Sequence, residues 1–295
     1  MRWNDALADF LDYLKLERGL SQNSVDNYRF DVLKLMRFLT KNNNTTNPVK
    51  IKTSDVQEFV YASSKKLKPP SQARLLSGLR LFFDYLVLEG FRDTNPLELI
   101  ESPKIGSNIP TTLSVAEVDA LIASFDIEKP LELRNMAMIE LLYSCGLRVS
   151  ELVTLRLSDL FFEEELIKVL GKGNKQRFVP IAKSARRYIL QYLNVRIIPV
   201  KGHEDFLFLN NRGKHLTRAM VFTVIRKAAT QAGIEKKISP HTLRHSFATH
   251  LVENGADIST VQQMLGHANI TTTERYLHMS NKHLKKSLLK YHPRG

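Results

Sequence analysis

Apolar residues in the first hundred positions recur every three or four residues, the spacing that places them on one face of an α-helix. They predict four amphipathic helices, around residues 7–14, 21–39, 54–60 and 69–90. Glycine, proline or polar residues follow each stretch, as is typical of helix ends. Because each helix has an apolar stripe to bury, the four together predict a small helical domain.

A change in pattern marks the end of this domain. From about Ser102 to Leu113 the chain holds two prolines, a glycine and several Ser and Thr residues, with little periodicity. Such a composition suits an exposed connection between domains. We therefore expect one domain over residues 1–103, a linker over 104–112 and a second domain over 113–295.

The second domain mixes helical and strand-like patterns. Ser114 and Glu117 form a capping-box pair that opens a helix running to about Phe125, and a mostly buried helix ends at Gly146. Another helix is expected over 217–233, with three further capped helices after it. Two β-like runs flank a glycine-rich turn in ELIKVLGKGNKQRFVPI and predict a hairpin, while FLFLNNRGK predicts one more short strand and turn. The expected fold is mainly α with a small antiparallel β-sheet (α+β).

Composition narrows the class of protein. At 295 residues the chain can bury two cores, and 43% hydrophobic with 25% charged residues is the balance of a soluble globular protein. No apolar run approaches the roughly 20 residues of a membrane span, and the first residues lack an apolar signal core. Cys145 is the single cysteine, which excludes an intramolecular disulfide and fits a reducing compartment. We expect a cytoplasmic protein.

The positive charge is concentrated in the second domain. The net charge is +13, and residues 104–295 carry 28 basic against 17 acidic residues, compared with 15 against 13 in residues 1–103. A basic domain attracts polyanions, because each neutralised phosphate releases a counterion. A surplus of solvated surface charge would give the same composition, so charge alone makes nucleic acid a candidate partner and no more.

One group of candidate residues lies at a predicted helix start. Ser239 is a good N-cap, and Pro240 fits the first helical position. His241 and Arg244 are three residues apart, so they share a face in the first turns of this helix. The free N–H groups and the positive dipole of a helix N-terminus suit a phosphate. A histidine at such a position is common, however, and one pair alone is weak evidence.

Two further candidates follow this helix. An apolar stripe predicts another helix that ends at Gly266, so His267 lies just beyond its C-terminus. Thr271 and Glu274 make a second capping box, which opens a short helix carrying Tyr276. A lone tyrosine in such a helix is more often a half-buried packing residue than a nucleophile.

Two basic candidates lie upstream. Gly146 breaks a helix and leaves Arg148 in the joint before the next one, where an ion pair with Glu151 is the alternative role. Lys172 lies between two glycines at the predicted hairpin tip, from which a long cation can swing toward a ligand. An ordinary solvated turn lysine is its alternative. Taken singly, neither residue points to function.

Together these segments are far more specific. GLRVSEL, GKGNKQRFVP, HTLRHSFATHL and LGHANITTTERY occur in this order between residues 146 and 276. The set resembles the tyrosine recombinase (phage integrase) family, and ERGLS and RLLSGLRLFFDYL in the first domain match it too. The length and the C-terminal HPR are most similar to the Xer branch, the XerC/XerD-like chromosome-resolving recombinases of bacteria. The resemblance covers essentially the whole chain.

The resemblance implies a role for each candidate. Arg148 and Arg244 match the two arginines that hold the scissile phosphate, a task that suits the bidentate fork of a guanidinium. Negative charge grows on the phosphate oxygens in the transition state, so fixed cations stabilise it preferentially. His241 and His267 match the histidine positions and would donate to the phosphate or assist proton transfer.

The same comparison assigns the nucleophile and the acid. Tyr276 matches the tyrosine that attacks DNA and leaves a 3′-phosphotyrosine, whose bond energy is kept for rejoining. Lys172 matches the hairpin lysine that protonates the leaving 5′-oxygen, although Lys175 in the same turn is an alternative. The implied enzyme is a DNA strand transferase that needs neither ATP nor a metal. No acidic cluster accompanies the histidines, and two of them lie near arginines, which repel a cation, so we expect no metal and no cofactor.

Partners and rival functions follow from the same resemblance. It implies a double-stranded DNA recombination site, a tetramer on two such sites formed with itself or a second Xer-type subunit, and contact with the DNA translocase FtsK. It also makes residues 1–103 a DNA-binding clamp, with candidate phosphate contacts at Lys65, Lys66, Lys68, Arg74 and Arg80. The alternatives are a catalytically inactive DNA-binding accessory factor, a relaxing topoisomerase, and a phage or mobile-element integrase.

The C-terminal tail carries one more expectation. Leu284, Leu288 and Leu289 follow helical spacing beside a row of lysines, and a helix this short needs a groove to bury its stripe. The resemblance implies that the tail docks on a neighbouring protomer. Folding back onto its own domain is the alternative.

Overall fold

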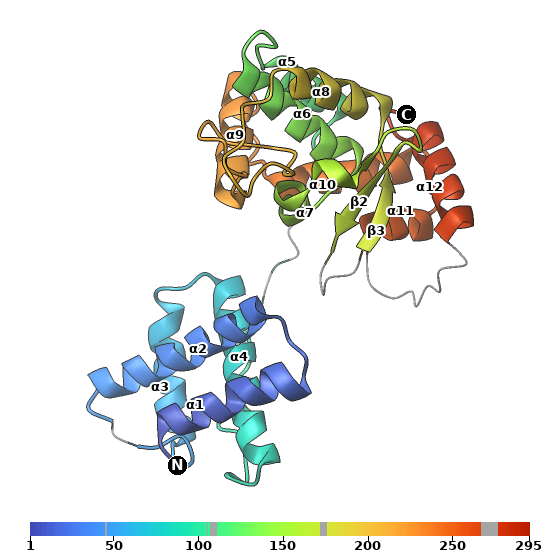
Figure 1. Ribbon diagram of the computed structural model, residues 1–295. Helices are drawn as coiled ribbons and strands as arrows, with labels where there is room; N and C mark the ends of the chain where they lie inside the picture. Colours follow the sequence, from blue (N-terminus) through green and yellow to red (C-terminus); the bar gives the residue numbers. More distant parts are fainter. Residues whose placement is uncertain (45, 105, 107–110, 172–175, 267–276) are drawn as a thin grey trace. The chain divides into compact units, whose positions relative to one another are not determined.

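The computed structural model describes the chain except residues 45, 105, 107–110, 172–175 and 267–276, and it leaves out the side chains of 277–282. The chain forms two compact units, Met1–Asn108 and Ile109–Gly295 (Figure 1). The expected linker, residues 104–112, spans this division.

The first unit is helical, as predicted. Its helices are α1 (Trp3–Asp12), which continues as a π-helical segment (Tyr13–Glu17), α2 (Gln22–Lys41), α3 (Thr53–Ser64) and α4 (Pro69–Leu88). Aromatic residues fill the centre of the unit, where the rings of Phe10 and Phe82 meet edge to face with centroids 5.3 Å apart. Both side chains are fully buried, and such contacts hold α1 against α4.

An ion pair between a half-exposed arginine and a buried aspartate also ties α2 to α4. Asp31 is completely buried, and Arg74 donates to both of its carboxylate oxygens at 2.5 and 2.9 Å. Arg80 is engaged as well, because it donates to Ser102 Oγ at 2.9 Å and to the carbonyl of Ile100. Two of the five candidate phosphate contacts therefore already serve the fold of this unit. The other three, Lys65, Lys66 and Lys68, are exposed.

The second unit contains more helices and a small sheet. Its helices are α5 (Val115–Ala123), α6 (Pro130–Ser144), α7 (Val149–Thr154), α8 (Lys183–Asn194), α9 (Arg218–Gln231), α10 (Pro240–Glu253), α11 (Ile258–Leu265) and α12 (Leu277–Tyr291). The predicted capping box of α5 is confirmed, since Ser114 Oγ accepts from the N–H of Glu117 and the Glu117 carboxylate accepts from that of Ser114. Helix α6 is buried along nearly its whole length and packs against α8 and α10. None of the described helices is long and apolar enough to cross a membrane.

The sheet has three antiparallel strands in the order β1 (Leu160–Phe161), β2 (Leu166–Leu170) and β3 (Gln176–Pro180). The predicted hairpin is confirmed by the β2–β3 register, in which Ile167 lies opposite Val179. The strand predicted in FLFLNNRGK is wrong. The segment forms only two isolated bridges, Arg156 to Phe206 and Leu209 to His215. A strand needs a neighbouring strand of similar length to pair with, and this segment has only single residues opposite it.

The C-terminal helix packs on its own domain. Leu284 and Leu288 are buried in the core of the second unit, and α12 contacts β3, α10 and α11 (Figure 1). Leu289, the third residue of the predicted stripe, is 41% exposed. In the single chain the stripe thus packs within its own domain, which was the alternative, and docking of the tail on a neighbouring protomer stays a prediction.

Candidate active site

A sharp turn after α6 delivers the first arginine of the site. Gly146 has φ +59°, and a Cβ added there would meet the ring of Phe247 at 2.5 Å, so both backbone conformation and close packing require glycine. Two residues later Arg148 forms the N-cap of α7. The predicted helix break is confirmed, and it places Arg148 at the start of a new helix.

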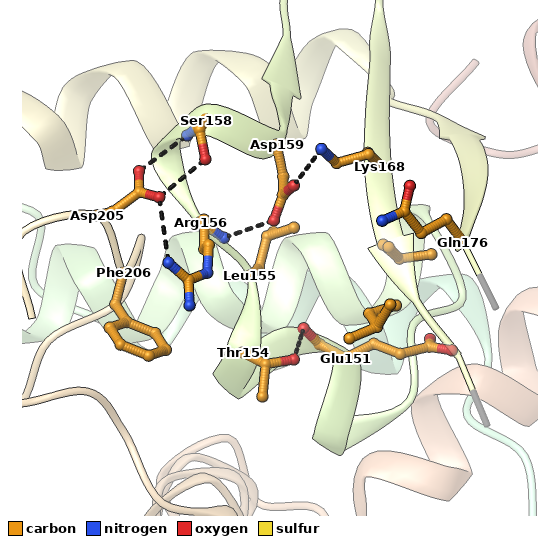
Figure 2. A pocket seen from close by; sticks show the side chains of 12 residues that line it. Glu151, Thr154, Leu155, Arg156, Ser158, Asp159, Lys168, Gln176, Asp205 and Phe206 are labelled. Atoms are coloured by element: carbon orange, nitrogen blue, oxygen red, sulfur yellow. Dashed lines mark hydrogen bonds and ion pairs between the residues drawn. The ribbon is translucent and has the colours of Figure 1, made fainter. Parts of the chain in front are cut away.

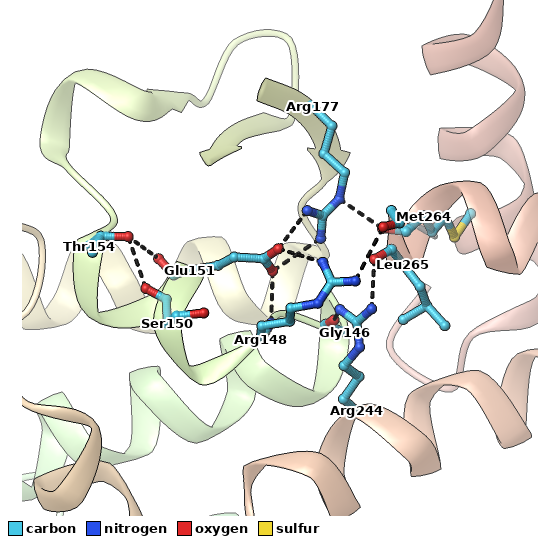
Figure 3. A network of polar contacts seen from close by, with 10 residues as sticks. Gly146, Arg148, Ser150, Glu151, Thr154, Arg177, Arg244, Met264 and Leu265 are labelled. Atoms are coloured by element: carbon cyan, nitrogen blue, oxygen red, sulfur yellow. Dashed lines mark hydrogen bonds and ion pairs between the residues drawn. The ribbon is translucent and has the colours of Figure 1, made fainter. Parts of the chain in front are cut away.

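Arg148 is held by a buried carboxylate. Its backbone N–H donates to Glu151 Oε2 at 2.8 Å, and its Nη1 donates to Oε1 at 2.9 Å (Figure 3). The ion pair with Glu151 that was the alternative role is therefore present. Nη1 makes this ion pair, and Nη2 donates to the carbonyl of Gly266 at 3.2 Å. The side chain is still 30% exposed, so part of the guanidinium remains accessible to a ligand.

The second arginine comes from the first turns of α10. Ser239 caps this helix and Pro240 is its first residue, as predicted. Arg244 is 8% exposed and donates to the carbonyls of Gly146 and Leu265, both at 2.6 Å. Burial, followed by repulsion from Arg148, lowers the pKa of Arg244 to about 10. The guanidinium stays charged at neutral pH and is held rigidly by two backbone oxygens.

An open cavity of about 610 Å³ brings these groups together. Arg148, His241 and Arg244 all line it, with His241 exposed at the N-terminal end of α10. The remaining lining residues are Thr111, Lys237, Thr242, His245, Ala248 and Leu265. The cavity therefore combines two fixed guanidiniums, two imidazoles and a helix N-terminus, a set of donors suited to an oxyanion.

Three predicted site residues cannot be placed. Lys172, His267 and Tyr276 lie outside the described residues, and so does Lys175. The elements that flank them are described: β2 and β3 on either side of residues 172–175, and α11 and α12 on either side of 267–276.

The sequence reading missed other residues of the site. Lys237 and His245 line the cavity, and Arg177 on β3 donates to Glu151 beside Arg148. For two of these three residues the sequence held a signal. His245 is one helical turn beyond His241, and Arg177 shares a strand face with the buried Val179, a place where a cation needs an anionic partner.

A second cavity, of about 420 Å³, is lined by Glu151 and Thr154 of α7 and by residues of β2 and β3 (Figure 2). Its lining contains two cations, and each of them is paired with a carboxylate of the same cavity. Arg156 approaches Asp205 at 3.5 Å, and Lys168 approaches Asp159 at 3.1 Å. With its cations already matched by carboxylates, this cavity is less suited to a phosphate than the one beside Arg148 and Arg244.

Comparison with known proteins agrees with the geometry. The Phage integrase family matches residues 111–283, and the N-terminal SAM-like domain of phage integrases matches residues 7–90. The chain is 41% identical over 296 residues to the tyrosine recombinase XerD of Listeria innocua, covering 99% of this chain and 100% of the relative.

Solved structures share the fold. The crystal structure of XerA recombinase is 31% identical, with coverage of 99% of both chains and a TM-score of 0.50. The XerH recombinase bound to its palindromic difH substrate is 24% identical, with coverage of 95% of this chain and 83% of that one, and its TM-score of 0.71 supports the fold. The chain belongs to the phage integrase family, as a site-specific tyrosine recombinase of the Xer type.

Proposed function

We propose that this recombinase cuts and rejoins DNA in the cavity lined by Arg148, Arg244 and His241, with Tyr276 as its nucleophile. The observation that carries this proposal is the convergence of both arginines on one cavity from helices nearly a hundred residues apart in sequence. Each guanidinium is oriented by oxygens of the protein and retains N–H groups for a phosphate.

The reaction is a phosphoryl transfer with no net change in the number of phosphodiester bonds. The Tyr276 oxygen attacks phosphorus, the bond to the 5′-oxygen breaks, and a 3′-phosphotyrosine remains. The phenol proton is lost and the leaving 5′-oxygen gains one. Attack by a 5′-hydroxyl reverses these steps and releases the tyrosine, so the covalent bond stores the energy for rejoining.

Each neighbouring group has a defined task in this scheme. Arg148 and Arg244 bind the non-bridging oxygens and stabilise the charge that builds there in the pentacoordinate transition state. His241 and His267 donate to the phosphate or assist the transfer of the phenol proton. Lys172 protonates the leaving oxygen, with Lys175 as the alternative.

The partners in this proposal are a double-stranded recombination site and further recombinase subunits, either copies of this chain or a second Xer-type protein, assembled as a tetramer on two sites. The likeness to XerD proteins supports a recombinase of the Xer type. We propose in addition that it resolves chromosome dimers at a terminus site during segregation, in the cytoplasm and under the control of the translocase FtsK, as the resemblance to Xer recombinases implies. Exposed Lys65, Lys66 and Lys68 are candidate phosphate contacts of the N-terminal unit.

A covalent-trapping experiment tests the proposal. The recombination site is first found as the protected segment in a chromosomal footprint, and a nicked duplex carrying it is then incubated with the protein. Wild-type protein should form a covalent adduct on a denaturing gel, and Tyr276→Phe, which removes one oxygen, should bind the DNA without forming the adduct. Adducts from Tyr276→Phe at the wild-type rate would falsify the assignment. Binding without adducts by the wild-type chain would identify an accessory factor instead.

A further inference from the structure

A third arginine lies close to the two that line the cavity, although it does not line the cavity itself. Arg177 lies on β3, and its guanidinium grips the Glu151 carboxylate with two hydrogen bonds, Nη1 to Oε1 at 2.6 Å and Nη2 to Oε2 at 3.1 Å (Figure 3). The Glu151 side chain is 1% exposed and the Arg177 side chain 16% exposed. The same carboxylate also accepts from Arg148, so a single buried anion holds two guanidiniums.

Arg177 is the leading partner that stabilises the ionised form of this carboxylate. Burial alone would raise the pKa of Glu151. The hydrogen bonds and charge of Arg177, ahead of the contacts with Arg148, outweigh burial and leave the pKa below its ordinary value. Glu151 is therefore ionised at neutral pH, and its charge must be matched within the protein.

The three arginines also share one helix end. The last carbonyls of α11 accept from them in turn: Met264 from Arg177 at 3.3 Å, Leu265 from Arg244 at 2.6 Å and Gly266 from Arg148 at 3.2 Å. Carbonyls at a helix C-terminus lack intrahelical partners and carry a partial negative charge, so they favour cations.

Gly266 makes this convergence possible. It ends α11 in the left-handed conformation, and a Cβ added there would meet Cδ and Nε of Arg177 at 2.9 Å. Arg177 thus packs directly on Gly266, where the positive φ favours glycine and an added Cβ would make the Arg177 side chain shift.

The charges around Glu151 do not cancel. Two guanidiniums, those of Arg148 and Arg177, contact the one carboxylate, and of these two only Arg148 lines the cavity. If Arg177 were absent, the buried charge of Glu151 would be opposed chiefly by Arg148. The attraction between Arg148 and a phosphate would fall, because its nearest charged neighbour would be an unmatched anion.

We propose that Arg177 is a positioning residue for strand transfer, which matches the charge of Glu151 and thereby leaves the charge of Arg148 available to the scissile phosphate. This inference rests on the proposed function, in which Arg148 binds that phosphate. Arg177 itself does not touch the DNA in this account. It acts through Glu151 and through the end of α11.

The test separates charge from packing by comparing an unbalanced variant with a balanced one. Arg177→Met removes the cation and leaves the Glu151 charge unmatched. The double variant Glu151→Gln with Arg177→Met removes both charges, and the glutamine Oε1 can still accept from Arg148. Arg177→Lys keeps a cation but lacks the fork. Covalent-adduct formation is measured in single turnovers at saturating protein on the nicked duplex, together with DNA affinity and thermal unfolding.

We expect Arg177→Met to slow adduct formation by about 30-fold or more, with DNA affinity changed less than about threefold. Arg177→Lys should lie between this variant and wild type, and the double variant should regain at least about tenfold over Arg177→Met. A purely structural role predicts that removing both side chains is no better than removing one, so a double variant as slow as Arg177→Met, or a normal rate for Arg177→Met, would overturn the proposal.

The same experiment keeps the two proposals apart. If the wild-type chain forms no adduct, the proposed function fails whatever Arg177 does. If wild type forms the adduct, Tyr276→Phe does not, and Arg177→Met reacts normally, only the inference about Arg177 fails. Thermal unfolding identifies a variant that has simply lost its fold, and the balanced double variant then decides the question at a temperature where it is folded.

Discussion

Arg294, the penultimate residue of the chain, lies against Glu140 in the middle of α6, with Nε 3.3 Å from Oε1. The Glu140 side chain is 1% exposed, and burial raises its pKa despite the opposing charge of Arg294. Arg294 also donates to Asp119 on α5 at 2.5 Å. The last residues of the chain are therefore fastened to two helices of the domain core.

This anchor predicts a marked effect of a change far from the cavity. Arg294→Ala would leave a buried carboxylate without its cation, which we expect to destabilise the second unit by about 2–4 kcal/mol. Adding Glu140→Gln should recover part of this loss, because the buried charge is gone. Trp3, the one tryptophan, lies in the other unit, so hydrogen exchange of α6 amides is the suitable measurement. Unchanged exchange in Arg294→Ala would show that the pair contributes nothing.

The neighbouring His292 predicts a dependence of stability on pH. Its ring packs between Tyr143 and Phe247, and burial, then the charges of His250 and Arg294, lower its pKa to about 3. The folded chain thus binds fewer protons than the unfolded chain between pH 6.5 and 3. The stability from His292 is present above pH 6.5 and is lost as pH falls.

We expect this loss to reach at most about 1.4 kcal/mol per pH unit between about pH 6 and 4. Glu140 changes stability in the opposite direction on acidification, because a carboxyl whose pKa is raised by folding binds more protons in the folded chain than in the unfolded chain. The difference in pH-dependent stability between wild type and His292→Phe gives the contribution of the histidine. The variant should lose less stability on acidification, measured by the same α6 exchange. Equal slopes for the two proteins would mean that His292 is not buried in its neutral form.

Arg244 offers a prediction about geometry as well as charge. Its two contacts, to the carbonyls of Gly146 and Leu265, need a fork that lysine lacks. Arg244→Lys should therefore slow adduct formation by about a hundredfold although the charge is kept, and Arg244→Ala or Arg148→Ala by several hundredfold or more, with DNA affinity falling far less. A large loss of affinity at an unchanged rate of cleavage would instead assign these residues to binding alone.

Much of this fold could be predicted because its signals are local. The capping residues Ser114 and Ser239 and the breaks at Gly146 and Gly266 lie where the structure starts and ends its helices. Segment 206–214 looked like a strand because it opens with a run of four apolar residues, Phe206 to Leu209, and continues into a polar turn with a glycine. Pairing depends on a neighbour distant in sequence, and only isolated bridges form there.

The residues of the candidate site likewise fall into those with a local signal in the sequence and those without one. Arg148, Arg244 and His241 could be found from motifs, since each follows a helix boundary. Arg177 could not be found by that route, because its importance lies in the carboxylate of Glu151 and the carbonyl of Met264, which are 26 and 87 residues away. In the sequence, pairing with Glu151 was the alternative to a functional role for Arg148, whereas in the structure Glu151 orients this arginine.

The proposed role of Lys172 as the general acid can be tested with a chemically altered DNA strand. If Lys172 protonates the leaving 5′-oxygen, a strand with sulfur at that bridging position needs no proton, because a thiolate is a good leaving group. Lys172→Ala should be slow on ordinary DNA and close to wild type on the sulfur-substituted strand. Lys175→Ala is the matched control and should be affected little on either. Equal defects of Lys172→Ala on both substrates would move the role to another group.

The packing of α12 on its own domain changes what a tail deletion would report. Removal of all residues after Ser280 would take Leu284 and Leu288 out of the core, so a loss of recombination could arise from instability alone. Single substitutions on the helix avoid this ambiguity. Leu288 is 2% exposed and Leu289 is 41% exposed, which makes them a matched pair one residue apart.

Leu288→Ala should destabilise the second unit by about 2–4 kcal/mol, and Leu289→Ala by less than about 0.5 kcal/mol. Both should bind a single DNA site, provided that binding is measured well below their unfolding temperatures. If the exposed Leu289 also meets a neighbouring subunit on DNA, Leu289→Ala should bind a two-site duplex with lower cooperativity in a gel-shift titration, despite its normal stability. Wild-type cooperativity and recombination by Leu289→Ala would show that the outer face of α12 makes no such contact, and that the helix serves its own domain.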